Sequence, residues 1–393
     1  MSELEKQIED KIGEVRTDAL DMSFGEIASL HRERELIIRP EYQRLFRWSE
    51  AQQSRLIESV LLELPVPPIM VIEGVDGRYE LIDGLQRISS VFHFMDPELL
   101  RGQETVRASD DATAATAALP LRAEGDAPEG DVGRPLVLTD CDLVEKLNGM
   151  TFEDLPLALR LRIRRSSLRM VVVRRHSSPL LRYEMFKRLN TGGSLLSPQE
   201  IRNCTSRMVG DAGTTFYEFL VECAELREFQ TCIEPLSDSE RNQKGDEELV
   251  LRFLALANAR DEFAGSVRDW LDWYMDEVIL ERRTFDYDEQ RTVFRTLFTY
   301  ISEAMGPDAF VLHTDNGPRG GLKPAYFEAI AGGVLGVPLE ALRQANTTTV
   351  SDAIVRVTRS DEFREVTGPG ANTKPKLERR IGLIRGRLQE IIQ

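Results

Sequence analysis

The sequence predicts an α+β protein in which an N-terminal domain with a small mixed sheet is followed by a mainly α-helical C-terminal domain. Short runs rich in Ile, Val and Tyr at 69–73 and 78–82, and a further apolar run at 168–173, predict the strands. Beyond residue 205, apolar residues recur at the spacing of amphipathic helices. A chain of 393 residues is long enough for two domains, which we place at 20–205 and 206–393.

A strand and a helix open the predicted N-terminal domain. The strand at 36–39 ends at Pro40, because proline has no N–H to give to a sheet ladder. The helix at 50–64 follows Ser49, a good N-cap residue, and Gln52 stands where a capping box needs its partner.

The remainder of this domain combines a hairpin, an insertion and a return to the sheet. Glycines at both ends of 74–77 supply hairpin turn chemistry. The stretch from about 108 to 133 is rich in Ala, Gly, Asp, Glu and Pro, which predicts a mobile insertion within the domain. A strand at 136–139 and a helix at 152–164 then resume the fold before the strand at 168–173.

Helices dominate the predicted C-terminal domain. The apolar spacing predicts them at 214–228, 246–258, 266–280, 287–305, 324–331, 339–344, 349–357 and 376–392. The sequence contains no Walker A motif and no Rossmann fingerprint. A nucleotide site would therefore have to be of another kind.

One candidate is the run Asp83-Gly84-Leu85-Gln86-Arg87, which lies between a predicted strand and a predicted helix. The start of a helix presents backbone N–H groups and a partial positive charge, and both suit an anion. Gly84 allows close approach of the backbone, Arg87 can hold a phosphate, and Asp83 can bind a metal or polarise a water. The alternative is an ordinary Asp-Gly turn followed by a solvated arginine.

Two further segments carry polar residues in a similar setting. The first, at 38–49, holds Tyr42, Gln43, Arg44, Arg47 and Trp48 ahead of the helix at 50–64. The second, at 185–203, contains Asn190, two glycines and a Ser-Pro-x-Glu helix start at 197–200. Most of this second segment is also explained as helix punctuation.

Together the three segments resemble the DGQQR domain, the N-terminal part of GmrSD-type, modification-dependent restriction enzymes in the ParB/sulfiredoxin-like superfamily. The family pattern is represented here by Pro40 to Trp48, Leu64 to Ile69, Asp83 to Arg87 and Phe186 to Arg202. One departure is Leu85, which stands where the family signature has its first Gln. The Gly-x-x-Arg element is kept, so the resemblance implies nucleotide binding more strongly than hydrolysis.

The resemblance implies a role in anti-phage defence, in which a nucleoside triphosphate is bound, and in several members hydrolysed, to control cutting of DNA. That cutting usually lies in a C-terminal HNH nuclease domain, which needs clustered histidines around a metal. The four histidines of this chain are far apart in sequence, so we expect no such domain; they are His31, His93, His176 and His313.

The expected mechanism is Mg²⁺- or Mn²⁺-dependent hydrolysis of a nucleoside triphosphate, since phosphoryl transfer depends on metal and cationic neutralisation. Asp83 is the expected metal ligand. The catalytic candidates are Asp83, Gln86 and Gln43, with either glutamine orienting the attacking water. The phosphate- or nucleotide-binding candidates are Arg44, Arg47, Gly84, Arg87, Ile88 and Asn190.

Two other classes of function stay open at this point. One is a ParB-like protein that binds or nicks DNA directly. The other is a non-catalytic nucleotide sensor that regulates a separate nuclease subunit, which the substitution at Leu85 favours.

Charge limits the expected contact with nucleic acid. A net charge of −16 argues against a general nucleic-acid coat, because nonspecific binding depends on phosphate neutralisation. Seven arginines nevertheless lie between Arg160 and Arg175. Either they line a groove for DNA or the nucleotide, or they stand at a helix C-terminus because the helix dipole stabilises positive charge there. The basic stretch at 374–387 is expected to be a solvated helix face.

The remaining composition predicts a cytoplasmic protein with reduced thiols. No run approaches the ~20 apolar residues of a membrane span, and the acidic first ten residues do not resemble a signal peptide. The four cysteines show no C-x-x-C pairing, which predicts buried or idle thiols; they are Cys141, Cys204, Cys223 and Cys232.

Overall fold

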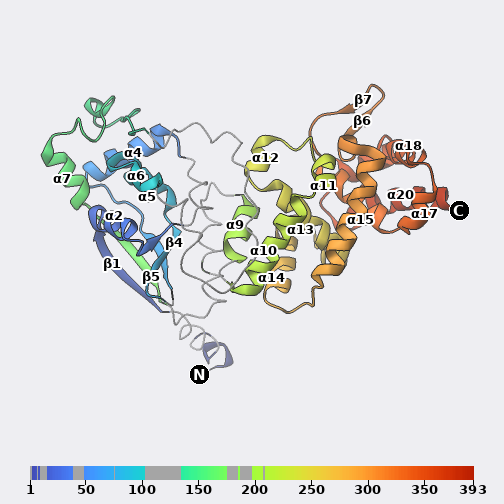
Figure 1. Ribbon diagram of the computed structural model, residues 1–393, viewed down its shortest axis with the longest axis horizontal. Helices are drawn as coiled ribbons and strands as arrows, with labels where there is room; N and C mark the ends of the chain where they lie inside the picture. The colour runs from blue at the N-terminus through green and yellow to red at the C-terminus, as the bar shows by residue number, and fades with distance from the viewer. Residues whose placement is uncertain are drawn as a thin grey trace. The chain divides into compact units, whose positions relative to one another are not determined.

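A computed structural model describes residues 2–6, 8, 16–38, 48–74, 76–101, 134–174, 185, 197–206 and 209–393. It divides into two compact units, Met1–Leu195 and Leu196–Gln393 (Figure 1). The first unit holds a small mixed sheet with helices, and the second is almost wholly helical, so the predicted α+β class is confirmed. The predicted insertion at 108–133 lies outside the described residues.

The sheet of the first unit has the strand order β1-β5-β3-β4-β2 among the described residues. Antiparallel pairs (β1 with β5, β3 with β4) alternate with parallel pairs (β5 with β3, β4 with β2), which makes the sheet mixed. The strands are β1 (Thr17–Ser23), β2 (Leu36–Ile37), β3 (Ile69–Glu73), β4 (Tyr79–Asp83) and β5 (Ser167–Val173).

Helices pack around this sheet and complete its core. Helix α4 contacts both α5 and α7, and α2 contacts β1 and β2. Phe24, Ile57, Val71, Phe92 and Met170 are fully buried or nearly so. The helices are α2 (Phe24–Arg32), α4 (Glu50–Leu61), α5 (Leu85–Met95), α6 (Glu98–Arg101) and α7 (Leu157–Arg165).

The capping prediction for α4 is confirmed. Ser49 Oγ accepts a hydrogen bond from the Gln52 N–H at 3.3 Å, and Gln52 Oε1 accepts one from the Ser49 N–H at 3.0 Å. The sequence analysis missed β1 and α2, although Ser23 and Glu26 form the same kind of capping box between them. That S-x-x-E pattern was the available signal.

The prediction of a strand at 136–139 is wrong. Leu136 and Leu138 are buried, as in a strand, but the segment is a loop fastened to a neighbouring turn. The Leu138 N–H donates to Met150 O at 2.9 Å, and the Gly149 N–H donates to Leu138 O at 2.7 Å. A short apolar run indicates burial, and it does not by itself supply a partner strand.

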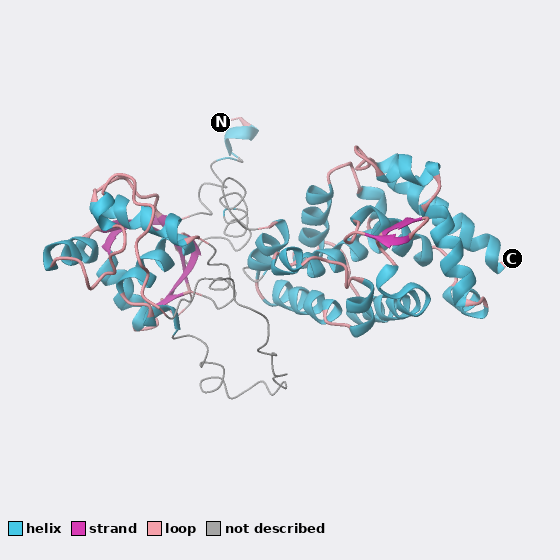
Figure 2. Ribbon diagram, turned by 90° about the horizontal axis from the view of Figure 1, so that it is seen from above, coloured by secondary structure: helices cyan, strands magenta, loops and turns pink. Residues whose placement is uncertain are grey.

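The second unit is a helical assembly with one short hairpin (Figure 2). Helices α15 and α17 have the predicted bounds, whereas the helix predicted at 214–228 divides into α10 and α11. The helices are α9 (Pro198–Ser206), α10 (Asp211–Ala224), α11 (Arg227–Cys232), α12 (Asp238–Asn242), α13 (Gly245–Asn258), α14 (Val267–Ile279), α15 (Tyr287–Met305), α16 (Pro324–Leu335), α17 (Leu339–Gln344), α18 (Thr347–Thr358), α19 (Asp361–Thr367) and α20 (Lys374–Ile392), and the hairpin is β6 (Leu312–Thr314) with β7 (Gly317–Arg319).

Aromatic packing and close helix contacts form the core of this unit. Phe294 and Phe298 have ring centroids 4.4 Å apart, and Phe298 also packs edge-on against Phe229 at 4.8 Å. Helices α16 and α20 approach so closely that a Cβ on Gly333 would lie 2.5 Å from Ile384 Cγ2. None of the described helices combines the length and apolar character that crossing a bilayer requires.

The cysteine prediction is confirmed. All four cysteines are buried, and none of them forms a disulfide. Burial raises the pKa of Cys141 to about 11 and the pKa values of Cys223 and Cys232 to about 12. These three thiols therefore stay protonated near neutral pH.

Candidate functional site

The run Asp83 to Arg87 forms the predicted strand-to-helix turn. Asp83 ends β4, Gly84 is the N-cap of α5 and Leu85 is the first residue of that helix. Gly84 has φ +100°, and a Cβ there would lie 2.3 Å from Ile69 Cγ2. Glycine is thus required both for the left-handed backbone and for the close approach of β3.

Arg87 ties this turn together. Its Nη2 donates to Asp83 Oδ2 at 2.6 Å and to the Pro68 carbonyl at 3.0 Å. The side chain is only 18% exposed, and its buried Nε has no hydrogen-bond partner. The guanidinium carries five N–H donors, and no described residue accepts from Nε or Nη1, so capacity for an anion remains.

Trp48, from the segment at 38–49, contacts the Asp83–Arg87 turn. The Trp48 N–H donates to Gln86 Oε1 at 3.1 Å, and the Trp48 carbonyl accepts from Gln53 Nε2 at 2.9 Å. Gln86 belongs to the first turn of α5, while Trp48 follows the Gln43–Arg47 stretch directly. The structure therefore brings Trp48, the residue that follows that stretch in sequence, to the start of α5.

Several predicted site residues fall outside the described residues: Gln43, Arg44, Arg47 and Asn190. Ile88 is described, and its side chain is fully buried in the core. Its backbone N–H already donates to Gly84 O at 3.0 Å, as the first intrahelical bond of α5. Asp83, Gly84, Gln86 and Arg87 are the candidates that the structure brings together.

A divalent metal would find a sparse site here. Asp83 is 37% exposed, and Arg87 occupies its Oδ2. Within the described parts of the chain there is no group of three or more His, Cys, Asp or Glu residues fit to hold a metal. Mg²⁺ commonly binds one or two carboxylates together with phosphate oxygens and water, so a lone Asp83 fits it when a nucleotide supplies the remaining ligands.

The histidines have structural contacts. His31 nitrogens lie 3.1 Å and 3.0 Å from the carbonyls of Leu36 and Leu99. His313 contacts Thr358 Oγ1 at 2.8 Å, and burial lowers its pKa. His93 is also hydrogen-bonded through both nitrogens, and His176 lies outside the described residues.

Much of the positive charge between Arg160 and Arg175 is compensated by nearby carboxylates. Arg169 makes two hydrogen bonds to Asp21, which hold the pKa of that carboxyl below its usual value. Arg174 pairs with Asp18 and Glu73, and Arg160 pairs with Glu153. Arg175 lies outside the described residues, and a DNA contact by this segment stays a prediction.

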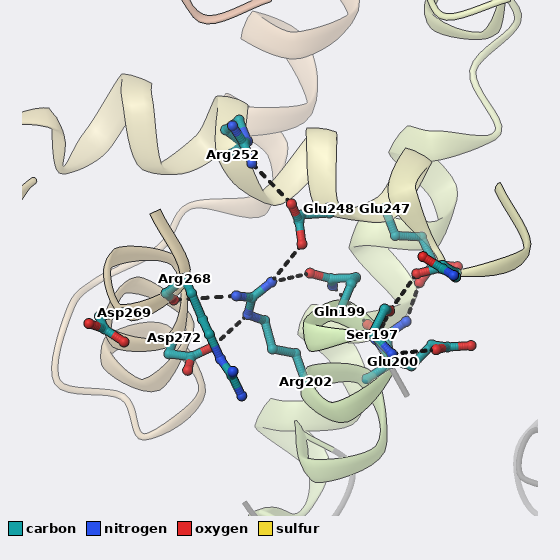
Figure 3. Close-up of polar contacts among 12 residues, drawn as sticks. Ser197, Gln199, Glu200, Arg202, Glu247, Glu248, Arg252, Arg268, Asp269 and Asp272 are labelled. Carbon is teal, nitrogen blue, oxygen red and sulfur yellow. Dashed lines mark hydrogen bonds and ion pairs between the residues drawn. The ribbon is translucent and has the colours of Figure 1, made fainter. Parts of the chain in front are cut away.

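The described end of the segment at 185–203 lies in α9, which packs within the helical unit (Figure 3). The predicted cap is present: the Glu200 N–H donates to Ser197 Oγ at 3.2 Å, and the Ser197 N–H donates to Glu200 Oε2 at 2.7 Å. Arg202, only 4% exposed, donates to Asp272 Oδ1 at 2.7 Å and to Glu248 Oε2 at 3.2 Å. Here Arg202 serves helix packing.

The contacts of Arg202 continue as an alternating series of charges that we call the buried ladder, comprising Asp272, Arg202, Glu248, Arg252, Glu328 and Arg380. Arg252 donates to Glu248 at 3.0 Å and to Glu328 at 2.7 Å, and Glu328 also pairs with Arg380. Burial acts to raise the pKa of Glu248, but Arg252 and Arg202 outweigh it and hold that pKa below its usual value.

Sequence reasoning missed this ladder, and it was wrong about Arg380. The solvated face predicted for 374–387 is contradicted there, because Arg380 is 0% exposed. Its Nη1 also donates to Ala371 O at 2.9 Å. The available signal was the charged Glu and Arg pairs at helical spacing in α13, where Glu248 and Arg252 are four residues apart.

Comparison with known proteins agrees with the resemblance stated from the motifs. Residues 25–206 match the family described as GmrSD restriction endonuclease, N-terminal domain. A search of the curated proteins and a search of the solved structures found no match. The matched range runs from α2 to the last residue of α9, so it includes both the Asp83–Arg87 turn and Arg202. Residues 25–206 of this chain are therefore similar to the N-terminal domain of GmrSD-type restriction endonucleases.

Proposed function

We propose that this chain is a component of a restriction system, in which a nucleoside triphosphate binds at the start of α5 and is hydrolysed to control action on DNA. The observation that carries the proposal is the turn at Gly84, where a helix start whose N-cap residue has no Cβ lies beside the guanidinium of Arg87. The presence of a domain found in restriction endonucleases supports the biological setting.

In this proposal the first-turn N–H groups of α5 and the Nη1 group of Arg87 bind phosphate oxygens. Arg44 and Arg47 supply further positive charge, and Asn190 contacts a phosphate or the ribose. The hydrogen bond from Arg87 to the Pro68 carbonyl supports this role, because it fixes the guanidinium next to the start of β3 before any ligand binds.

Asp83 is the proposed ligand of Mg²⁺ or Mn²⁺, which when bound would neutralise charge on the phosphates. Gln43 or Gln86 orients a water that attacks the terminal phosphorus, and the products are a nucleoside diphosphate and inorganic phosphate. Asp83 gives up or shares its contact with Arg87 when it binds the metal.

A second candidate function is nucleotide sensing without turnover, with a separate nuclease subunit as the partner. Two contacts favour it: Asp83 is paired with Arg87, and the Gln86 amide oxygen accepts from the Trp48 backbone. Both side chains that the hydrolytic mechanism uses are thus engaged in holding the turn.

The experiment that separates these functions is phosphate release from each of the four ribonucleoside triphosphates with Mg²⁺, comparing the wild type with Asp83→Ala. Turnover that is lost in the variant, and stimulated by DNA, supports the hydrolytic proposal. Absence of turnover together with a nucleotide-dependent rise in Tm supports the sensor. DNA affinity that falls steeply with salt and ignores nucleotide would instead favour direct DNA binding.

A further inference from the structure

The two edge strands of the five-stranded sheet differ in length. The strand order places β2 at one edge and β1 at the other. β2 has only two residues, and a short edge strand offers little to a further strand. β1 has seven residues, none of them proline or lysine, and in the part of the chain that the structure describes it pairs with β5 alone. The other side of β1 is therefore an open strand edge.

The hydrogen-bond pattern of β1 shows which backbone groups face this open edge. The Arg174 N–H donates to Arg16 O at 2.9 Å, and the Phe24 N–H donates to Ser166 O at 3.1 Å, just beyond the two ends of the β1–β5 pair. Hydrogen-bonded and non-bonded pairs alternate along an antiparallel ladder, so the even-numbered residues of β1 are the ones that bond to β5. The N–H and C=O groups of residues 17, 19 and 21 therefore point away from the sheet.

These outward backbone groups are not used within the described residues. The next residue of the series, Ser23, gives its N–H to Glu26 Oε2 at 2.7 Å, as part of the cap of α2. The backbone groups of Thr17, Ala19 and Asp21 have no such bond to any described residue, and all three residues are exposed. Three N–H donors and three C=O acceptors thus stand in a row, as the addition of a further strand requires.

The charged side chains of β1 do little to protect this edge. Charges often keep other chains away from an edge strand. Here Asp21 accepts two hydrogen bonds from Arg169, at 3.0 Å and 3.1 Å, and Asp18 pairs with Arg174. Both carboxylates of β1 are therefore compensated by arginines of β5, and a strand that approaches β1 meets little net charge.

The apolar side of the sheet is incomplete at the same edge. Leu20 is paired with Met170 and Met22 with Leu168, so these side chains share one side of the sheet. Met170 and Leu168 are buried, whereas Leu20 and Met22 are only half-buried. A further strand beside β1 would bring side chains next to Leu20 and Met22 and cover them.

We propose that β1 pairs with β1 of a second copy of this chain, antiparallel, so that the two sheets join into one. Ala19 of one copy faces Ala19 of the other, and Thr17 faces Asp21, in hydrogen-bonded pairs. All three outward residues of each copy are then used, and three pairs of two bonds each give six hydrogen bonds. The pairing lies outside the nucleotide site and does not depend on it.

A second copy fits this edge because β1 is complementary to itself when it is reversed. Around an axis at Ala19, Asp18 of one copy faces Leu20 of the other, so no two carboxylates are opposed. The two copies of Leu20 become diagonal neighbours and cover one another. A register with Thr17 against Ala19 would use fewer outward groups and would place Asp18 opposite Asp18, which is unfavourable.

Disulfide cross-linking of the full-length chain tests this register. Ala19→Cys places two thiols in a directly opposed pair with about 5.5 Å between the Cα atoms, which a disulfide can span. Asp21→Cys is the control, because its two copies would lie four residues, or roughly 14 Å, apart. The native cysteines are buried and should contribute little background.

On mild oxidation we expect Ala19→Cys to form a covalent dimer roughly tenfold faster than Asp21→Cys. A mixture of Thr17→Cys chains with Asp21→Cys chains should also cross-link quickly, because these two positions face each other in the proposed register. Equal rates for Ala19→Cys and Asp21→Cys would overturn the proposal.

Sedimentation of the full-length chain tests the pairing without a cross-link. Ala19→Pro removes an outward N–H and no bond to β5, and an edge strand tolerates proline at such a position. Ala19→Ser keeps the N–H and is the matched control. We expect Ala19→Pro to weaken self-association by about 10- to 100-fold, since both central hydrogen bonds are lost, and Ala19→Ser to stay within about threefold of the wild type.

Two results of sedimentation would overturn the proposal. One is a wild type that remains a monomer at roughly 100 µM, the weak end of specific association. The other is a dimer that Ala19→Pro leaves unchanged. If Ala19→Pro lowers Tm and so fails to fold normally, the cysteine variants decide alone, because they keep every backbone N–H of β1.

Discussion

Two arginines of the GmrSD-type domain, Arg87 and Arg202, occupy opposite kinds of surroundings. Arg87 bonds one carboxylate and one carbonyl through a single nitrogen, while its Nε has no partner. Arg202 donates through all three nitrogens to Asp272, Glu248, Gln199 and Arg268. The first retains donors that a ligand can use, whereas the second gives four of its five N–H donors to its own fold. Arginine in a family motif therefore indicates a site only where hydrogen-bond capacity is left over.

The largest expected effect is on stability, and it comes from the buried ladder. Arg202→Met removes one of the two arginine partners of Glu248 and the ion pair of Asp272 with Arg202, both in a poorly solvated place. We expect the free energy of unfolding to fall by about 3–5 kcal/mol. Chemical denaturation followed by tryptophan fluorescence measures this, since Trp270 and Trp273 report on α14 of the helical unit.

The double variant Arg202→Met/Asp272→Leu sharpens the same test. Removing both charges leaves fewer carboxylates uncompensated, so part of the lost stability should return. A double variant less stable than Arg202→Met would show that Asp272 contributes through a contact other than this pair.

The next effect is expected at Gly84. In Gly84→Ala the new Cβ meets Ile69 and the backbone must keep φ +100°, so we expect a loss of about 2–3 kcal/mol. The nucleotide-dependent rise in Tm should also disappear, because the start of α5 must move. Thermal melting with and without nucleotide measures both.

Gly77→Ala is the control for Gly84→Ala. Gly77 also has a positive φ, of +83°, yet no atom lies within 4 Å of its added Cβ. It should lose only about 1–2 kcal/mol, which is the cost of the backbone conformation alone. Equal losses at the two glycines would mean that the contact with Ile69 relaxes without difficulty.

A smaller effect on stability, with a larger one on ligand, is expected for Arg87→Met. Its partner Asp83 is 37% exposed and can be solvated, so we expect the loss of stability to stay near 1 kcal/mol. Nucleotide affinity should fall by about 10- to 100-fold, since charge-assisted bonds to phosphate are lost. Isothermal titration measures the affinity, and a loss of stability matching that of Arg202→Met would remove the contrast between the two arginines.

The sequence predicted more of the first region than of the second, for a physical reason. The turn at Gly84 and the cap at Ser49 depend on residues near one another in the chain, and both lie where predicted. The ladder depends on five helices brought together by tertiary packing. The sequence alone therefore predicted a solvated Arg380, although this residue is fully buried. The prediction of a strand at 136–139 failed for a similar reason, because tertiary packing buries residues of this loop as a sheet would bury those of a strand.

The smallest expected effect is on the reactivity of the buried thiols. Their labelling rates compare how often each of the two units opens locally. Cys141 of the first unit and Cys223 and Cys232 of the second have raised pKa values, so their thiolates are scarce at pH 8. Below those pKa values a disulfide reagent should react only through rare openings, and the rate should rise with pH as thiolate forms. We expect the order of reaction to follow the order in which the surroundings of the three thiols open, since the folded protein shields them from the reagent. Peptide mapping after timed labelling measures the order.

If Arg202→Met accelerates the labelling of Cys223 and Cys232 but not that of Cys141, the ladder stabilises the helical unit alone. Equal acceleration at all three cysteines would mean that the ladder also stabilises the unit with the Gly84 turn.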